Sequence, residues 1–194
     1  LDFAGKVYVA PLTTCGNLPF RRVMKGQGAD ITCGEMAFAS ELVAGNPAEW
    51  ALVRRHVSED VFGVQITGPN SAVIAQAAEL LERHTRVDFV DINAGCPIDL
   101  VCDKGMGACL MTKTTKLRDV LVTLDRILTV PVTLKMRTGF EMATLALDPQ
   151  AFQPPAHIPI DRVELVRGVP GPEVLAPASE HGVQRGNRVA RILV

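Results

Sequence analysis

Residues 87–99 read VDFVDINAGCPID, an apolar run that changes abruptly into a loop. The run 87–93 predicts a buried strand that ends on a polar side chain, Asn93. Gly95 permits a tight turn after that strand, and Pro97 restricts the backbone just beyond it. We therefore expect Cys96 to be held at a fixed place past the carboxyl end of the strand.

On both sides of this stretch, apolar runs of β type alternate with segments of helical pattern. Four further strands are predicted at 7–10, 31–33, 61–66 and 131–136. Asn17 and Pro19 are typical of a helix start. The predicted helices span 17–25, 49–55, 70–84 and 116–128. Strands separated by single helices indicate right-handed crossovers and hence a parallel sheet.

Residues suited to a functional site occur where the predicted strands end. They are Pro11, Glu35, Gln65, Asn93 and Lys135. Open α/β sheets and (β/α)8 barrels both place their sites at the carboxyl ends of parallel strands. The chain contains neither GxGxxG nor GxxxxGK(S/T), which removes the two simplest nucleotide-binding patterns. We therefore expect an α/β protein of the (β/α)8 barrel type.

The thiol of Cys96 has two possible roles on such a loop. An ordinary thiol is mostly protonated at neutral pH, so it can act as a nucleophile or as a proton donor. The alternative is a buried thiol that serves as a small hydrophobic side chain. The spacing of the later cysteines, without a suitably placed histidine, is a poor zinc pattern, and no metal site is predicted. We interpret four cysteines as structural: Cys15, Cys33, Cys102 and Cys109.

The composition bounds the class of protein. The 194 residues are 47% hydrophobic, and 20 Lys and Arg residues face 21 Asp and Glu residues, for a net charge of -1. These values exclude a disordered, collagenous or strongly basic chain, and they argue against bulk electrostatic binding to nucleic acid. No apolar run reaches the roughly 20 residues of a membrane span. With five cysteines and no secretion signal, we expect a soluble, intracellular protein, cytoplasmic or nuclear.

The composition changes near Gly139. Seven of the 13 prolines and none of the six lysines lie in 140–194. A (β/α)8 barrel takes about 250 residues, so five predicted strands indicate an incomplete barrel. We expect the barrel portion to span 3–139 and the segment 140–194 to be an irregular, divergent tail. Because a strand-like run follows so soon after Leu1, the chain is interpreted as a piece of a longer protein.

Several longer motifs point to a known family. They are APLTTCGNLPFRR at 10–22, TCGEM at 32–36, EWAL at 49–52, DVFGVQ at 60–65, VDFVDIN at 87–93, GCPIDLV at 95–101 and LKMRTG at 134–139. Together they resemble the flavin-dependent tRNA-dihydrouridine synthases, most closely the eukaryotic dihydrouridine synthase 3 branch. The resemblance covers about residues 3–139 and stops there.

The resemblance implies a barrel that carries FMN, uses NADPH to reduce it, and acts on a uridine in tRNA. In the family, hydride goes to C6 of the uracil ring and the loop cysteine protonates C5, which gives Cys96 the role of general acid. Carried over by motif, Asn93 and Arg137 would contact the substrate. The residues that would bind the flavin are Pro11, Leu12, Thr13, Gln65 and Lys135.

Other interpretations stay open at this point. The chain could be a truncated, non-catalytic remnant that binds RNA or a partner, or another FMN barrel such as a pyrimidine or dihydroorotate dehydrogenase. Lys135 and Arg137 could instead pair with carboxylates such as Glu35 or Asp91. The pairs Arg21-Arg22 and Arg54-Arg55 are expected on solvated helix faces, with RNA contact as the alternative.

Overall fold

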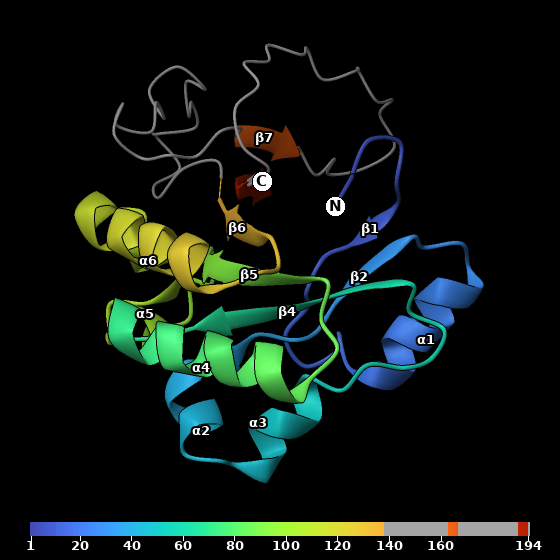
Figure 1. The fold of residues 1–194 in the computed structure, drawn as a ribbon, viewed down its shortest axis with the longest axis horizontal. Coiled ribbons are helices and arrows are strands. Elements are labelled where there is room, and N and C mark those ends of the chain that lie inside the picture. Colours follow the sequence, from blue (N-terminus) through green and yellow to red (C-terminus); the bar gives the residue numbers. More distant parts are fainter. Residues whose placement is uncertain (138–162, 167–189, 194) are drawn as a thin grey trace.

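The core of the protein is one parallel β-sheet with helices along one side (Figure 1). The computed structural model describes residues 1–137, 163–166 and 190–193. Five strands lie side by side in chain order, and every neighbouring pair is parallel. They are β1 (Tyr8–Val9), β2 (Ile31–Cys33), β4 (Val61–Thr67), β5 (Phe89–Ala94) and β6 (Val132–Met136). The described residues thus form a parallel α/β sheet, as the alternating pattern predicts, and this arrangement is consistent with an incomplete α/β barrel.

Three of the connections between these strands contain a longer helix where the periodicity predicts one. These are α1 (Leu18–Gly26), α4 (Ser71–His84) and α6 (Thr114–Ile127). The fourth predicted helix, 49–55, is shorter, because α3 (Pro47–Leu52) ends at Leu52. Four short elements escape the sequence pattern: β3 (Ala37–Phe38), α2 (Ala39–Val43), α5 (Asp99–Cys102) and the 3₁₀ helix η1 (Gly107–Leu110).

The start of α1 follows from its sequence. Asn17 caps the helix, because its Oδ1 accepts a hydrogen bond of 3.1 Å from the backbone N–H of Phe20. Pro19 lies in the first turn, where its missing N–H costs nothing. Asn70 caps α4 in the same way by accepting from the N–H of Val73 at 3.0 Å. Both helix starts agree with the sequence prediction to within one residue.

Each long strand turns alternate side chains to opposite sides of the sheet. On the helix side, the even-numbered residues of the central strands join the main apolar core, which contains Phe62, Val64, Ile66, Val90, Ile92, Val132 and Leu134. On the other side, the odd-numbered residues include the polar Gln65, Asp91 and Thr133. The side without helices is therefore the one on which polar groups meet.

A glycine makes room for an aromatic ring on this second side. Gly63 of β4 is in register with Phe89 of β5, and a Cβ at Gly63 would lie only 2.1 Å from the Phe89 ring. The ring also meets Phe3 and Tyr8 edge to face, with centroid distances of 6.0 and 6.4 Å. This aromatic cluster fills the interior near the amino ends of the strands, whereas the polar groups lie nearer the carboxyl ends.

The segment that the sequence predicts to be irregular contributes two strands. These are β7 (Val163–Val166) and β8 (Ala190–Leu193). β8 pairs in parallel with β6, and β7 pairs with β8 on the outside. The expectation of a wholly irregular tail is therefore wrong at these eight residues; the rest of 140–194 lies outside the described residues. β6, the last strand predicted from the sequence, therefore has a paired strand on each side, β5 and β8.

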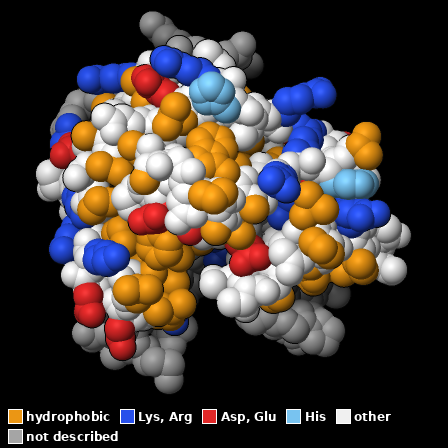
Figure 2. All heavy atoms as spheres, turned by 90° about the horizontal axis from the view of Figure 1, so that it is seen from below, with side chains coloured by type: hydrophobic (Ala, Val, Ile, Leu, Met, Phe, Trp, Pro, Cys, Tyr) orange, Lys and Arg blue, Asp and Glu red, His pale blue; other side chains and the backbone are white. Residues whose placement is uncertain are grey.

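Charged and hydrophobic side chains are mixed on one face of the molecule. On the face seen in Figure 2, patches of hydrophobic side chains lie between charged ones, and Lys and Arg gather mainly toward the margins. The described part of this face thus has no single basic patch. Among the described residues, we find no helix with the length and apolar character needed to cross a membrane.

Arg21 differs from its prediction as a solvated side chain. It is 1% exposed, and its Nε donates to Oε1 of Glu59 at 2.8 Å. Its other nitrogens donate to the carbonyl oxygens of Gly16 and Arg54, and the guanidinium stacks over the ring of Phe62. Burial works to raise the pKa of Glu59, but hydrogen bonds from Arg21, the His56 N–H and Thr32 outweigh it and lower the pKa.

Replacing Arg21 tests the importance of this buried ion pair. We expect Arg21→Met to lower the free energy of unfolding by about 3–5 kcal/mol, because Glu59 would keep a buried charge without its partner. Urea unfolding followed by circular dichroism measures the change. The neighbouring Arg22 is exposed, so Arg22→Met is the matched control and should stay within about 0.5 kcal/mol of the unmodified chain. Equal losses in both variants would contradict a special role for the pair.

Candidate functional site

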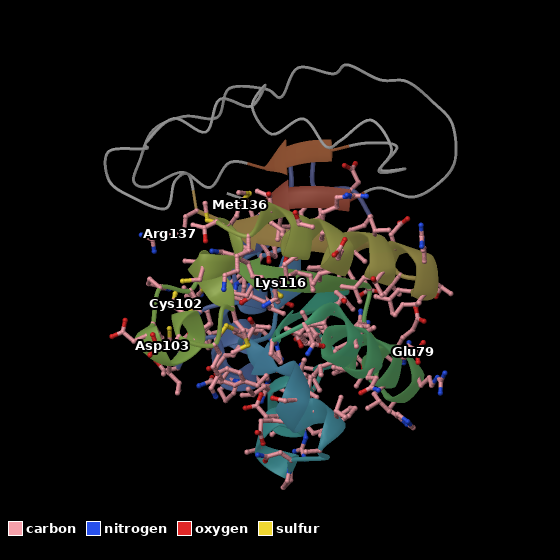
Figure 3. All side chains as sticks on the ribbon, turned by 90° about the vertical axis from the view of Figure 1, so that its left-hand side faces the viewer. Glu79, Cys102, Asp103, Lys116, Met136 and Arg137 are labelled. Atoms are coloured by element: carbon pink, nitrogen blue, oxygen red, sulfur yellow. The ribbon has the colours of Figure 1, made fainter. Side chains whose placement is uncertain are left out.

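The carboxyl ends of the central strands form the candidate site. Figure 3 views the molecule from the side toward which β4 and β5 point in Figure 1. Arg137 follows β6, and Cys102 and Asp103 belong to the loop after β5; in this view the three lie on the same side. Gln65, Asn93 and Lys135 all lie in the last four residues of their strands. The structure thus brings these predicted residues to one end of the sheet.

A chain of buried hydrogen bonds connects β4, β5 and the loop after β5. Gln65 Nε2 donates to Oδ2 of Asp91 at 2.6 Å, and Gln65 Oε1 accepts from Nδ2 of Asn93 at 2.8 Å. Asn93 Oδ1 in turn accepts from the backbone N–H groups of Gly95 and Cys96, at 3.1 and 2.9 Å. The predicted residues Gln65, Asn93 and Cys96 therefore belong to one connected network.

The strand register accounts for this network. Gln65 is opposite Asp91, and Asp91 is opposite Thr133, so the three side chains form a row across β4, β5 and β6. Thr133 Oγ1 donates to the second carboxylate oxygen of Asp91. Asn93 is opposite Lys135 in the next row, toward the carboxyl ends. Parallel strands in this register place the polar groups within hydrogen-bonding reach.

Asp91 and Thr133 were not predicted as site residues. Asp91 is fully buried, and the loss of solvent raises its pKa to about 6, although hydrogen bonds from Thr133 and Gln65 and the charge of Lys135 pull the other way. The signal was present in the sequence, because Asp91 is two residues before Asn93 and therefore on the same face of the strand. Its partner in β6 could not be named without the register.

Lys135 does not pair with Glu35, which was one interpretation of the sequence. Glu35 Oε2 instead accepts from the backbone N–H of Thr14 at 2.7 Å, and so holds the loop after β1. Within the described part of the chain, Lys135 makes no hydrogen bond and no ion pair shorter than 4.0 Å. Lys135 is half-buried, and its charge is close enough to Asp91 to influence the pKa of that carboxyl group.

The loop that carries Cys96 is closely packed. Cys96 is 9% exposed and forms an apolar cluster with Met36, Val101 and Met106. Its carbonyl oxygen accepts from the N–H of Ala108 at 2.8 Å. A Cβ at Gly107, whose φ is +57°, would lie 2.5 Å from that same oxygen. Hydrogen bonds at its backbone N–H and at its carbonyl oxygen therefore hold Cys96 in place. This agrees with the fixed position that the sequence predicts.

The remaining predicted site residues lie in the segments that follow β1 and β6. Pro11 is half-buried, while Leu12 and Thr13 are exposed in the loop after β1. Arg137 is exposed after β6, and the position of a Cβ at Gly95 would lie 3.5 Å from its Cγ. Among the other thiols, Cys33 is buried and Cys102 donates to the Cys96 carbonyl at 3.6 Å, whereas Cys15 is exposed and so is no part of the core.

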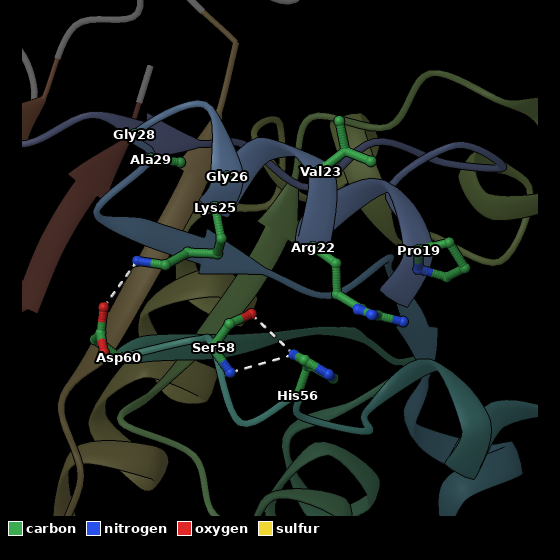
Figure 4. Close-up of a pocket in the computed structure, with 10 residues that line it drawn as sticks. All are labelled: Pro19, Arg22, Val23, Lys25, Gly26, Gly28, Ala29, His56, Ser58 and Asp60. Carbon is green, nitrogen blue, oxygen red and sulfur yellow. Dashed lines mark hydrogen bonds and ion pairs between the residues drawn. The ribbon is translucent and has the colours of Figure 1, made fainter.

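A broad hollow of about 880 Å³ lies elsewhere (Figure 4). It is lined by α1 and by residues that precede β2 and β4, so it is near the amino ends of the strands, away from the candidate site. Four of its five polar side chains form two pairs: Lys25 pairs with Asp60 at 3.0 Å, and His56 Nδ1 contacts Ser58 Oγ at 2.8 Å. The hollow contains none of the predicted site residues.

Comparison with known proteins identifies the family. A family model described as "Dihydrouridine synthase (Dus)" matches residues 8–147, which is most of the chain. The chain belongs to the dihydrouridine synthase family. This confirms the resemblance drawn from the sequence motifs. The matched range includes all the predicted site residues of this chain and extends past the change in composition near Gly139.

Individual relatives agree with this assignment. Proteins named "tRNA-dihydrouridine(47) synthase [NAD(P)(+)]-like" are 56% identical over 141 residues in Xenopus laevis and 55% identical over 141 residues in Homo sapiens. The protein of that name from Oryza sativa subsp. japonica is 51% identical over 140 residues. The matches cover 72–73% of this chain but only 20–22% of each relative. The chain therefore spans about a fifth of the length of the curated relatives it matches.

The raised pKa of Asp91 predicts how the stability of this chain depends on pH. A carboxyl group that binds its proton more tightly in the folded state favours folding at low pH, and this contribution is lost as the pH rises from about 4 to about 6. We expect Asp91→Asn, which cannot ionise, to escape that loss. Relative to the unmodified chain, its free energy of unfolding should rise by about 2.4 kcal/mol between pH 4 and pH 7.

Urea unfolding at several pH values measures this difference. The control is Asp119→Asn in α6, an exposed residue whose substitution should leave the difference from the unmodified chain constant with pH. A constant difference for Asp91→Asn as well would show that Asp91 titrates like an ordinary carboxyl group.

Proposed function

We propose that the protein carrying this chain is a flavin-dependent tRNA-dihydrouridine synthase. The proposal rests on the family assignment and above all on one observation: the Cys96 loop is fixed beside Asn93 at the carboxyl end of β5. A (β/α)8 barrel carries its catalytic groups at this end. The relatives' names, which specify tRNA-dihydrouridine synthase and NAD(P)(+), support tRNA as the substrate and NADPH as the reductant.

The residues at this end fit an FMN ring. Lys135 is a cation without a hydrogen bond among the described residues, and a cation suits the pyrimidine end of a reduced, anionic flavin. Gln65 uses one of its two amide hydrogens for Asp91, which leaves the second for the ring edge. Pro11, Leu12 and Thr13 would line the flavin from the loop after β1. When bound, FMN would supply the hydride that goes to C6 of the uracil ring.

Cys96 would supply the proton in this reaction. Its side chain lies among the apolar side chains of Met36, Val101 and Met106, and an ordinary thiol is mostly protonated at neutral pH. As hydride adds to C6 and the C5–C6 double bond becomes single, the proton on Sγ passes to C5 and leaves a thiolate, which regains a proton from solvent. Asn93 fixes the thiol by holding the Cys96 N–H.

The remaining contacts with the tRNA substrate would come from residues at the carboxyl ends of β5 and β6. A uridine must leave its stacked position in tRNA before its ring can lie over the flavin. Arg137 is exposed next to the Cys96 loop, where its guanidinium can form paired hydrogen bonds with a phosphate. We propose that Arg137 holds the backbone of the extruded nucleotide, and that Asn93 lies beside its base.

Flavin binding is the first test of this function. We expect FMN added to the purified chain to lose fluorescence and to shift its visible absorption. Lys135→Met should weaken binding about tenfold, because a charge-assisted contact would be lost. Lys6→Met is the control, since Lys6 is exposed and lies before β1, at the opposite end of the sheet. A chain without redox chemistry, the alternative function, predicts no flavin binding at all.

The role of Cys96 is tested in the full-length protein. We expect Cys96→Ala to retain flavin reduction by NADPH, since the thiol takes no part in it, and to lose dihydrouridine formation by at least about 100-fold. Stopped-flow absorbance measures the first reaction, and mass spectrometry of the digested tRNA measures the second. Cys15→Ala, which removes an exposed thiol, should behave like the unmodified protein. Normal tRNA product from Cys96→Ala would refute the general-acid role.

A further inference from the structure

We infer that Asp91 is a positioning residue, whose carboxylate fixes the orientation of the Gln65 amide and, through Gln65 and Asn93, the place of the Cys96 loop. The importance of that loop for chemistry rests on the proposed function. The positioning itself rests only on the hydrogen bonds and burial of these residues. Asp91 does not touch Cys96, and its effect passes through two intervening side chains.

The direction of the hydrogen bonds carries the argument. Every donor in the chain points toward Asp91: the Cys96 N–H donates to Asn93, Asn93 donates to Gln65, and Gln65 donates to Asp91. A side-chain amide has a donor and an acceptor end that exchange when it rotates by half a turn. The backbone N–H groups at one end of this series only donate and the ionised carboxylate at the other end only accepts, so Asp91 is the one side chain in the series that cannot exchange donor and acceptor by rotating.

Rotation of Gln65 would break the chain in two places. Its carbonyl oxygen would face the oxygens of Asp91, and its NH₂ group would face the NH₂ group of Asn93. Asn93 could recover a partner only by rotating as well, and it would then turn its own NH₂ group toward the N–H groups of Gly95 and Cys96. Gln65 is 2% exposed and Asn93 8% exposed, so water has little access to compensate for the lost contacts.

The second carboxylate oxygen of Asp91 accepts from Thr133, so both oxygens are held. An uncharged acceptor at position 91 would serve equally well for Gln65. In Asp91→Asn, the new amide oxygen accepts from Gln65 and the new NH₂ group donates to the Thr133 hydroxyl, which can also accept. The inference therefore requires that Asp91→Asn keeps the loop in place and that an apolar residue of similar size, as in Asp91→Leu, releases it.

The charge of Asp91 offers a rival explanation. Lys135 acts electrostatically on Asp91, so the carboxylate could matter only as a counter-charge for this lysine. Asp91→Asn and Asp91→Leu both remove the charge, and the rival explanation predicts that they behave alike. The hydrogen-bond explanation predicts that they differ, because only Asp91→Asn retains an acceptor for Gln65.

The experiment measures how fast iodoacetamide alkylates each cysteine of the chain, by mass spectrometry of the digested protein. Cys96 reports on its loop. Two other cysteines serve as standards within the same molecule: Cys15 is exposed and reports on the reagent, and Cys33 is 1% exposed and reports on opening of the whole sheet. Rates are taken from about pH 6.5 to about pH 9.5, which separates a change in access from a change in the thiolate fraction.

We expect Asp91→Leu to raise the alkylation rate of Cys96, relative to Cys15, about tenfold, while Cys33 stays protected. Asp91→Asn should leave the rate within about twofold of the unmodified chain. Thr133→Val removes the other hydrogen bond to Asp91 without touching Gln65, so it is the matched control and should also leave the rate unchanged.

The contrary outcomes are equally definite. If Asp91→Leu raises the alkylation rates of Cys96 and Cys33 together, Asp91 only stabilises the sheet. If Asp91→Asn and Asp91→Leu raise the Cys96 rate equally, the charge explanation is favoured. If Asp91→Leu does not raise the Cys96 rate, the inference is overturned directly. If Asp91→Leu does not fold because the Thr133 hydroxyl loses its partner, the double variant Asp91→Leu/Thr133→Val removes that hydroxyl and is compared with Thr133→Val alone. Loss of folding in the double variant would also count against the inference, because a positioning role does not require Asp91 for folding.

This measurement needs neither flavin nor tRNA. If the chain binds no FMN, the proposed function fails and the alkylation rates still decide the role of Asp91. If the alkylation rates do not respond to Asp91→Leu, the positioning role fails while flavin binding and the loss of product in Cys96→Ala stand as separate results.

Discussion

The register between β4, β5 and β6 is the constraint on which the rest of the site depends. It puts Gln65, Asp91 and Thr133 in one row, and this row anchors the loop that carries Cys96. A shift of one residue would turn each of these side chains toward the helices, where the core is apolar. The apolar packing of the helix side and the polar network of the other side are thus consequences of the same pairing.

Much of the fold could be predicted, because its larger elements have strong periodicity. The strands from Tyr8 to Met136 that pair in chain order follow from apolar runs of β type, and the long helices α1, α4 and α6 follow from the helical pattern of 3.6 residues. The short elements α5 and η1 have too few residues to show any period. β7 and β8 were missed because the composition of their segment gave no sign that a strand would pair with β6.

The site was predicted as far as local sequence allows. Cys96, Asn93 and Gln65 lie at strand ends within matched motifs, and the structure connects them. Asp91 and Thr133 were missed because their importance depends on contacts with other strands. Arg21 was misjudged for a similar reason: its partner Glu59 is 38 residues away, and nothing near Arg21 in the sequence announces a buried carboxylate. Pairings across such distances require the three-dimensional arrangement.

The close approach of Phe89 to Gly63 has a consequence for how such sequences can change over time. The two positions share a single volume, since a methyl group at residue 63 would overlap the ring at residue 89. A larger side chain at 63 is not tolerated while Phe89 is present, and a smaller one at 89 leaves a cavity while Gly63 is present. A smaller side chain at 89 would permit a larger one at 63. Among sequences with this fold, the two sites should therefore covary, and a lineage can move between the two solutions only through a poorly packed intermediate.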